Sequence, residues 1–198
     1  IWGQSKPLGA EVRQLSWAYN RAGPFGQMIF MRFEVINKSQ NVWDSAYLCV
    51  WSDPDLGNAF DDCAGVDTTV FDTATGEKRN LGFVYNGDNN DDGAASYGPN
   101  PPSVGYKYFQ GPRIPGLITD TAKWSGMRIP GFKNLNMSGF NFYCNPGQGG
   151  CTTPDWYDPS RYAQTYNVMR GITVTGKPWI DNNGDTKPAW RDQKRRIT

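Results

Sequence analysis

The sequence predicts an all-β protein: an antiparallel β-sandwich or jelly-roll-like domain with long loops rich in Asp, Gly and Pro and one short helix near 158–170. Eight Trp, ten Tyr and ten Phe supply residues that favour strands. The 23 Gly and 14 Pro residues indicate many turns between those strands. Alternation of apolar and polar residues in several segments is typical of strands with one buried face.

Two segments carry the strongest strand signals. Residues 27–37 alternate so that one face collects Ile29, Met31, Phe33 and Val35, with Arg32 and Glu34 on the other. Residues 43–51 are apolar on both sides, which predicts a central strand covered on both faces. Weaker signals lie at 12–19, 66–71, 81–85, 105–110, 139–143 and 172–174.

One helix is predicted near 158–170. Asp158-Pro159 provides an N-cap and a first-turn proline, and Gly171 can end the helix. One face of this helix would carry Tyr162, Tyr166 and Met169. We expect one calcium-stabilised domain over 1–180, followed by a polar segment or linker over 181–198.

Composition excludes several classes of function. The net charge of +1 gives no overall electrostatic reason to bind nucleic acid. No apolar run reaches the length of a membrane span. The absence of histidine removes a Ser-His-Asp triad and the ordinary His-ligated metal sites. Because the first residue is Ile1, we expect a processed chain or a piece of a longer one.

The densest acidic stretch follows residues 43–51. Sixteen Asp stand against three Glu in the chain, and short carboxylates on tight loops suit Ca²⁺, which takes six to eight oxygen ligands. The first predicted ligands are Asp53, Asp55, Asp61, Asp62 and Asp67. The alternative is a series of Asx turns and caps that needs no metal.

Two further acidic stretches are weaker candidates. The run 86–93 groups Asp88, Asn90, Asp91 and Asp92, of which Asp88, Asn90 and Asp92 are predicted calcium ligands. A plain hairpin tip would explain the run nearly as well, and its side chains could instead lend ligands to the first acidic stretch. Residues 181–185 resemble the opening of an EF-hand loop. They lack the glycine at its sixth position and the closing glutamate, which favours a solvated turn.

Four cysteines favour disulfides in an oxidising compartment. Of the three possible connectivities, we predict the local pairs Cys49–Cys63 and Cys144–Cys151, because each encloses a short, turn-rich loop. A Cys₄ zinc site is the competing interpretation, but the spacing has no C-x-x-C knuckle.

Catalysis and glycan binding are the remaining possibilities. A glycosidase needs two carboxyl groups flanking a bond. The glutamates in predicted strands, Glu11 and Glu34, form no pair that stands apart from the calcium-like clusters, so we expect no enzyme. Rings in loop-like contexts could stack on a glycan or could cap the ends of the sandwich: Trp124, Trp156, Tyr157, Trp179 and Trp190.

Several short sequence motifs, taken together, resemble a known protein family. They lie at 37–38, 51–57 (Trp-Ser-Asp-Pro-Asp-Leu-Gly), 61–62, 65–68, 85–88, 101–105, 109–112, 135–137 and 166–171. Their order resembles a β-rich region of large secreted surface proteins of Bacteroidota and related phyla, which the type IX system exports. The resemblance implies export, cell-surface or extracellular residence, and membership in a longer polypeptide or assembly.

We therefore expect a non-enzymatic extracellular structural or adhesive module of a surface assembly or filament, stabilised by Ca²⁺ and disulfides. Its expected partners are neighbouring domains or identical subunits, with residues 1–7 docking on one of them. The alternative is a glycan-binding module of a secreted polysaccharide-processing protein.

Overall fold

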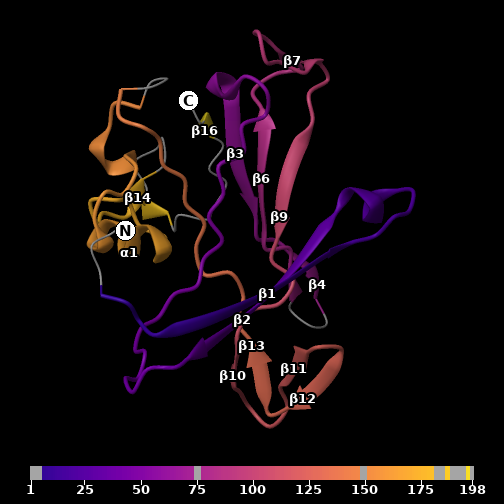
Figure 1. Cartoon of the computed structure of the whole chain (residues 1–198), viewed down its shortest axis with the longest axis vertical. Helices are drawn as coiled ribbons and strands as arrows, with labels where there is room; N and C mark the ends of the chain where they lie inside the picture. Colours follow the sequence, from indigo (N-terminus) through magenta and orange to yellow (C-terminus); the bar gives the residue numbers. More distant parts are fainter. Residues whose placement is uncertain (1–5, 74–76, 148–150, 181–185, 188–194, 197–198) are drawn as a thin grey trace. The chain divides into compact units, whose positions relative to one another are not determined.

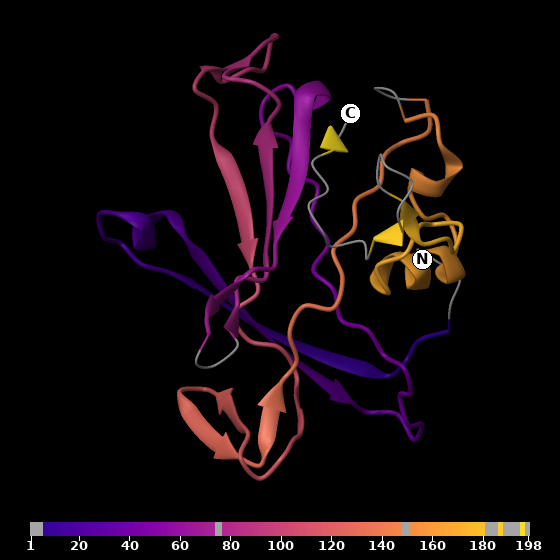
Figure 2. The same cartoon turned by 180° about the vertical axis from the view of Figure 1, so that it is seen from behind.

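The computed structural model describes residues 6–73, 77–147, 151–180, 186–187 and 195–196. It is mostly β, with one short α-helix and several small antiparallel sheets (Figure 1; Figure 2). This confirms the β-rich class and the single short helix. Within the described ranges the sheets form no closed sandwich or jelly roll, since each sheet except one has only two strands.

The strands and helices have the following bounds. The strands are β1 (Ala10–Ala18), β2 (Ile29–Asn37), β3 (Asp62–Asp67), β4 (Val70–Asp72), β5 (Glu77–Lys78), β6 (Leu81–Asn86), β7 (Asn90–Asp91), β8 (Gly98–Pro99), β9 (Ser103–Lys107), β10 (Arg113–Pro115), β11 (Thr121–Trp124), β12 (Met127–Pro130), β13 (Phe132–Asn134), β14 (Trp179–Ile180), β15 (Thr186–Lys187) and β16 (Arg195–Arg196). The α-helix is α1 (Tyr162–Met169), and the 3-10 turns are η1 (Pro24–Gln27), η2 (Ala59–Asp61) and η3 (Pro154–Trp156). The largest sheet has the order β16-β3-β6-β9, and the other sheets are the pairs β1–β2, β4–β5, β7–β8, β10–β13, β11–β12 and β14–β15.

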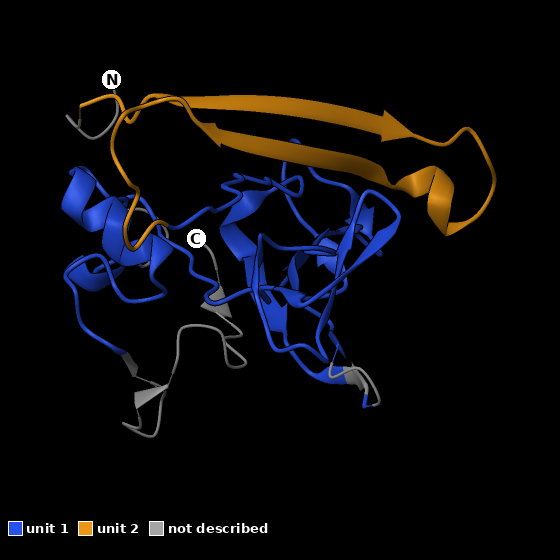
Figure 3. Ribbon diagram, turned by 90° about the horizontal axis from the view of Figure 1, so that it is seen from below, with its two compact units in different colours: residues 1–3, 47–198 blue, residues 4–46 orange. Residues whose placement is uncertain are grey.

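The chain divides into two compact units, Gln4–Ala46 and a second that contains Tyr47–Thr198 (Figure 3). The sequence predicts one domain over 1–180 and a polar segment over 181–198. Of that segment, the structure describes only β15 and β16. Residues 1–5, which include most of the predicted docking segment 1–7, lie outside the described residues.

The Gln4–Ala46 unit is built on a long β-hairpin. β1 and β2 pair along their whole length, from Ala10 opposite Asn37 to Ala18 opposite Ile29, which confirms the strands predicted at 12–19 and 27–37 with slightly different bounds. The predicted apolar face remains open to solvent. On it, Ile29 is 71 %, Met31 52 % and Phe33 45 % exposed.

The largest sheet in the other unit has one well-buried face. That face carries, from β3 and β6, the buried residues Asp62, Ala64, Val66, Gly82, Val84 and Asn86. The opposite face of this sheet shows why position 65 is a glycine. Phe83 on β6 lies directly opposite Gly65 on β3, and a Cβ at position 65 would collide with the Phe83 ring. Close approach of the Phe83 ring to the backbone therefore requires glycine at position 65.

The predicted central strand at 43–51 is wrong, because these residues form no strand. Ser45 has a φ of +54°, in the left-handed region, which interrupts an extended backbone. Leu48, Val50 and Trp51 are exposed. A segment that is apolar on both sides becomes a central strand only where two neighbouring strands form hydrogen bonds with it. The described strands pair with one another and not with residues 43–51.

The weaker strand signals have mixed outcomes. The segment 66–71 divides between β3 and β4, 81–85 is β6, and 105–110 overlaps β9. The segments 139–143 and 172–174 form no strand. They are joined instead by a side chain, since Asn141 Nδ2 donates to the Ile172 carbonyl at 2.8 Å.

Helix α1 begins later than predicted. Its N-cap is Arg161, whose N–H donates to Gln164 Oε1 at 3.1 Å, so Asp158 is not the cap. Gly171, with a φ of +78°, follows the end of the helix as predicted. In the described part of the chain, no helix is long and apolar enough to cross a membrane.

Candidate functional site

Two buried carboxylates anchor the loop that precedes β3. Asp62, the first residue of β3, is 2 % exposed, and its Oδ2 accepts a hydrogen bond from the Leu56 N–H at 2.9 Å. Asp91, the last residue of β7, is 1 % exposed. Its Oδ1 accepts from the Asn58 N–H at 3.0 Å and its Oδ2 from the Tyr97 N–H at 2.5 Å. We call Asp62 and Asp91, with the nearby Asp55 and Asp61, the carboxylate site.

Like charges act on Asp62 in the carboxylate site. Burial raises the pKa of Asp62, the charges of Asp61, Asp91 and Asp55 raise it further, and the hydrogen bond from Leu56 opposes them. The Oδ1 atoms of Asp61 and Asp62 are both buried without a hydrogen-bond partner in the described contacts. Unpartnered carboxylate oxygens beside like charges favour uptake of a cation or a proton.

The structure separates ligands that the sequence groups together. Asp62 and Asp67 lie at opposite ends of β3, roughly 16 Å apart at a strand rise of about 3.3 Å per residue. Calcium ligands lie about 2.3–2.6 Å from the ion, so these two aspartates cannot bind the same ion. Asp67 instead accepts bonds from Thr69 N–H at 2.9 Å and Thr69 Oγ1 at 2.7 Å.

Asp53 belongs to a different acidic group. Burial raises the pKa of Asp158, and the charge of Asp53 raises it further. The pKa of Tyr143 is raised to about 12, first by burial and then by Asp158, Asp53 and Cys49. The charge of Asp53 therefore acts on Asp158 and Tyr143, whereas that of Asp55 acts on Asp62.

The second acidic stretch forms local turns. Asp88 Oδ1 accepts from the Asn90 N–H at 2.8 Å, and Asp92 Oδ1 accepts a short hydrogen bond from Asn90 Nδ2. All three of these predicted ligands are exposed, whereas Asp91 between them is buried. The third stretch, 181–185, lies outside the described residues.

The sequence groups Asp91 with the second acidic stretch but does not select it as a ligand, although it is the buried member of that stretch. A Cβ at Gly57, which has a φ of +72°, would overlap Asp91 Oδ2. Across the described residues, no three His, Cys, Asp or Glu side chains converge closely enough to hold a metal ion. The calcium site therefore remains a prediction.

Two of the four cysteines form a disulfide, and the other two do not. Cys144 and Cys151 form the predicted disulfide, with Cα atoms 5.9 Å apart. Cys49 and Cys63 form no disulfide, so the other predicted bridge is absent. The ladder of β3 holds Cys63 opposite Tyr85, with its thiol 3.8 Å from the Asp61 carbonyl oxygen. Cys49 is exposed in a segment without regular structure, so short separation in sequence does not bring these thiols together.

The predicted glycan-contact rings are mostly half-buried. Trp124, Trp156 and Tyr157 all fall in this class. The Arg113 guanidinium lies over the Trp124 ring, 5.4 Å from its centroid. The side chains of Trp179 and Trp190 lie outside the described residues.

A more exposed aromatic cluster lies at the tip of the β1–β2 hairpin. It surrounds an open hollow of about 360 Å³ lined by Trp17, Tyr19, Arg21, Phe25 and Phe30. Trp17 and Phe30 stack with their ring centroids 5.5 Å apart. Tyr19 and Phe25 are about half exposed, at 50 % and 51 %. We call this cluster the aromatic hollow. Its residues converge through the hairpin register, which periodicity alone does not reveal.

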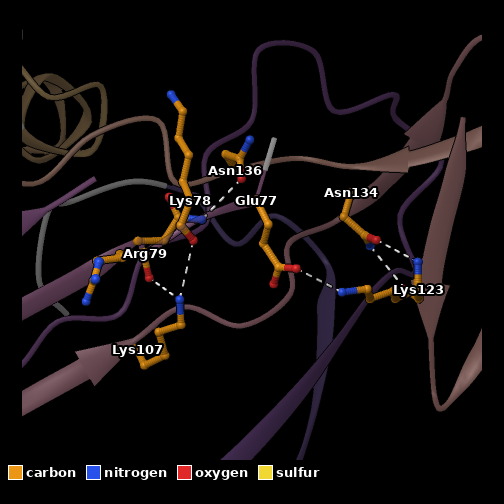
Figure 4. Close-up of polar contacts among 8 residues, drawn as sticks. Glu77, Lys78, Arg79, Lys107, Lys123, Asn134 and Asn136 are labelled. Atoms are coloured by element: carbon orange, nitrogen blue, oxygen red, sulfur yellow. Dashed lines mark hydrogen bonds and ion pairs between the residues drawn. The ribbon is translucent and has the colours of Figure 1, made fainter. Parts of the chain in front are cut away.

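Another polar cluster joins β5, β9, β11 and β13 (Figure 4). Lys123 Nζ lies 3.1 Å from Glu77 Oε2, and the Lys123 N–H donates to Asn134 Oδ1 at 2.7 Å. The Lys107 ammonium donates to the Arg79 carbonyl, and burial is the main cause that lowers its pKa. These contacts tie short strands together, which is a structural role.

The two glutamates of the hairpin form surface ion pairs. Arg13 Nε lies 2.6 Å from Glu11 Oε1, and Arg13 Nη1 lies 3.8 Å from Glu34 Oε2. Pairs of this exposure contribute little to stability. Glu11 and Glu34 thus share the guanidinium group of Arg13.

The chain matches no protein-family model, no curated protein and no solved structure.

Proposed function

We propose that this chain is a non-enzymatic structural or adhesive module of an extracellular surface assembly or filament. The observation that carries the proposal is the open apolar face of the hairpin at Ile29, Met31 and Phe33. An isolated two-stranded hairpin is marginally stable in water, and contiguous exposed apolar surface is typical of interaction sites. A partner covering this face would also supply the second layer of the predicted sandwich-like arrangement.

Calcium is the proposed stabilising ion, and the carboxylate site is where it would bind. Among the described residues, the Oδ1 atoms of Asp61 and Asp62 have no hydrogen-bond partner, and Asp55 and Asp91 add charge around Asp62. Ca²⁺ would neutralise this charge and draw the side chains of Asp55 and Asp61 toward Asp62. Asp91 replaces Asp67 in the proposed ligand set.

Extracellular residence is the remaining part of the proposal. The disulfide Cys144–Cys151 supports it, because such bridges persist in oxidising compartments. The resemblance to the secreted surface proteins of Bacteroidota supports it as well. Neighbouring domains or identical subunits are the proposed partners.

The test uses purified, fluorescently labelled chain added to producing cells stripped of their surface material. Wild type should bind saturably, and Phe33→Asp should not, since it places a charge on the apolar face. Ile118→Asp is the matched control, because Ile118 is 93 % exposed and lies outside the hairpin. Localisation of the native protein to the cytoplasm, or normal binding by Phe33→Asp, would overturn the proposal.

Glycan binding is the second candidate, and the aromatic hollow favours it. Rings that are about half exposed, such as Tyr19 and Phe25, could stack on a sugar. Quenching of tryptophan fluorescence by polysaccharides should then saturate, and Trp17→Ala should abolish the saturable part. Unsaturable quenching, or saturation unchanged in Trp17→Ala, would count against this function.

A further inference from the structure

The outer edge of β2 has backbone groups available for another strand. Among the described strands, β2 pairs only with β1. The Lys38 N–H donates to the Gly9 carbonyl at 2.9 Å, which makes residues 9 and 38 a hydrogen-bonded pair. Hydrogen-bonded and non-hydrogen-bonded pairs alternate along an antiparallel ladder. The even-numbered residues of β2 therefore bond to β1, and its odd-numbered residues direct their N–H and C=O groups outward.

The sequence of β2 is complementary to itself about Phe33. If a second β2 runs antiparallel with Phe33 opposite Phe33, Arg32 faces Glu34 of the other copy, and Glu34 faces Arg32. The apolar residues match as well, with Met31 opposite Val35 and Phe30 opposite Ile36. Opposite charges facing each other across strands stabilise a sheet.

Alternative registers are less favourable. Outward-directed groups must meet outward-directed groups, so an odd-numbered residue has to oppose an odd-numbered one. Moving the centre of symmetry to Arg32 places two arginines opposite each other, and moving it to Glu34 places two glutamates there. Like charges directly opposite destabilise a sheet. Among the registers centred on Arg32, Phe33 and Glu34, the charge pattern of β2 therefore favours the one centred on Phe33.

Over its full length, the edge of β1 lacks this complementarity. Pairing over the full length of β1 centres on Gln14 and sets Glu11 opposite Trp17 and Arg13 opposite Leu15. Each charge would then face an apolar side chain.

We propose that a second copy of this chain binds through β2, forming a two-fold, four-stranded sheet with the order β1-β2-β2-β1. The pairing exchanges both backbone hydrogen bonds at each outward-directed pair and brings the apolar faces of the two hairpins into one surface. This inference rests on the proposed function, because it selects an identical subunit as the partner at the edge of the hairpin; the joined apolar face is still to be covered by another layer.

Charge reversal tests the register in the full chain. Sedimentation velocity should show that wild type self-associates, and Arg32→Glu and Glu34→Arg should each weaken self-association on the order of tenfold or more, since each dimer contains two such charge pairs. An equimolar mixture of the two variants should associate again, because every facing pair is then of opposite sign. A merely structural role of either residue would not produce this rescue.

Disulfide trapping is the second measurement. In a Cys49→Ser, Cys63→Ser background, Phe33→Cys should form a linked dimer, since hydrogen-bonded antiparallel pairs have Cα atoms about 5.5 Å apart, within disulfide range. Met31→Cys in the same background should not, because its partner is Val35.

The outcomes separate the two proposals. A wild type that is monomeric at all concentrations, or reversed variants that associate as wild type does, would overturn the β2 pairing. If such a monomer still bound stripped cells, the surface function would stand with a different partner. A β2-linked dimer that never reached the cell surface would overturn the surface function alone.

Discussion

Replacement of Asp62 separates its role as a loop anchor from its proposed role as a calcium ligand. Asparagine keeps an oxygen that can accept the Leu56 N–H, whereas alanine leaves this donor, on a residue that is only 7 % exposed, without an acceptor. An unsatisfied buried donor costs about 1–3 kcal/mol. In a chain of this size each kcal/mol shifts Tm by about 2–4 °C. In EDTA, Asp62→Ala should therefore melt about 2–12 °C below Asp62→Asn.

Calcium should raise the Tm of wild type and fail to raise that of Asp62→Asn. A ligand at 100 times its Kd adds about 2.7 kcal/mol to a folded state that alone binds it, which corresponds to about 5–11 °C here. Differential scanning calorimetry with EDTA and with saturating Ca²⁺ measures both effects. Asp88→Asn is the matched control, because Asp88 is exposed and makes a local turn.

The pH dependence has a definite sign. Because the pKa of Asp62 is raised in the folded state, its ionisation disfavours folding. The contribution of Asp62 to the free energy of unfolding is larger at low pH. It falls as pH rises from the pKa of Asp62 in the unfolded chain, about 3.9, through its higher pKa in the folded chain. The Tm of metal-free Asp62→Asn minus that of wild type should therefore be larger at pH 7 than at pH 4.

Three results would refute this reasoning at different steps. An equal Tm for Asp62→Ala and Asp62→Asn in EDTA would show that Asp62 does not anchor the loop through Leu56. A wild-type Tm that does not change on chelation would show that the chain has no stabilising calcium site. A full calcium shift in Asp62→Asn would show that the ion binds elsewhere.

Further predictions concern cysteine, packing and pH. The unreduced, denatured chain should titrate two thiols, from Cys49 and Cys63; a titration of none would indicate a bridge between them. Gly65→Ala should destabilise the fold by about 1–3 kcal/mol in urea melts, because its Cβ collides with the Phe83 ring, and adding Phe83→Leu should recover part of the loss. The pKa of Asp155 is lowered, chiefly by a hydrogen bond from a threonine hydroxyl. Asp155→Asn should therefore be less stable than wild type at pH 7 by roughly 1 kcal/mol, and the difference should disappear as pH falls through the folded pKa. A difference that does not change with pH would assign the loss to packing.

Much of the local structure follows from the sequence. The alternation in 27–37 predicts β2 and its apolar face, because a strand turns successive side chains to opposite faces whatever its partners. The short loop between Cys144 and Cys151 similarly predicts their disulfide. In contrast, 43–51 has the composition of a central strand but forms none, because a strand also needs neighbours, which local composition cannot supply.

In the carboxylate site, some properties follow from the sequence and others only from the tertiary structure. The density of aspartates between 53 and 92 is a property of the sequence, and it alone predicts that charge must be balanced or hydrogen-bonded there. Which aspartates become buried depends on strand pairing across many residues, such as β3 with β6 and β7 with β8. Pairing turns Asp62 and Asp91 inward, and the length of β3 carries Asp67 away from them. Burial and distance from other charges set the pKa and the binding capacity of a carboxylate, and both are decided only when segments far apart in sequence meet.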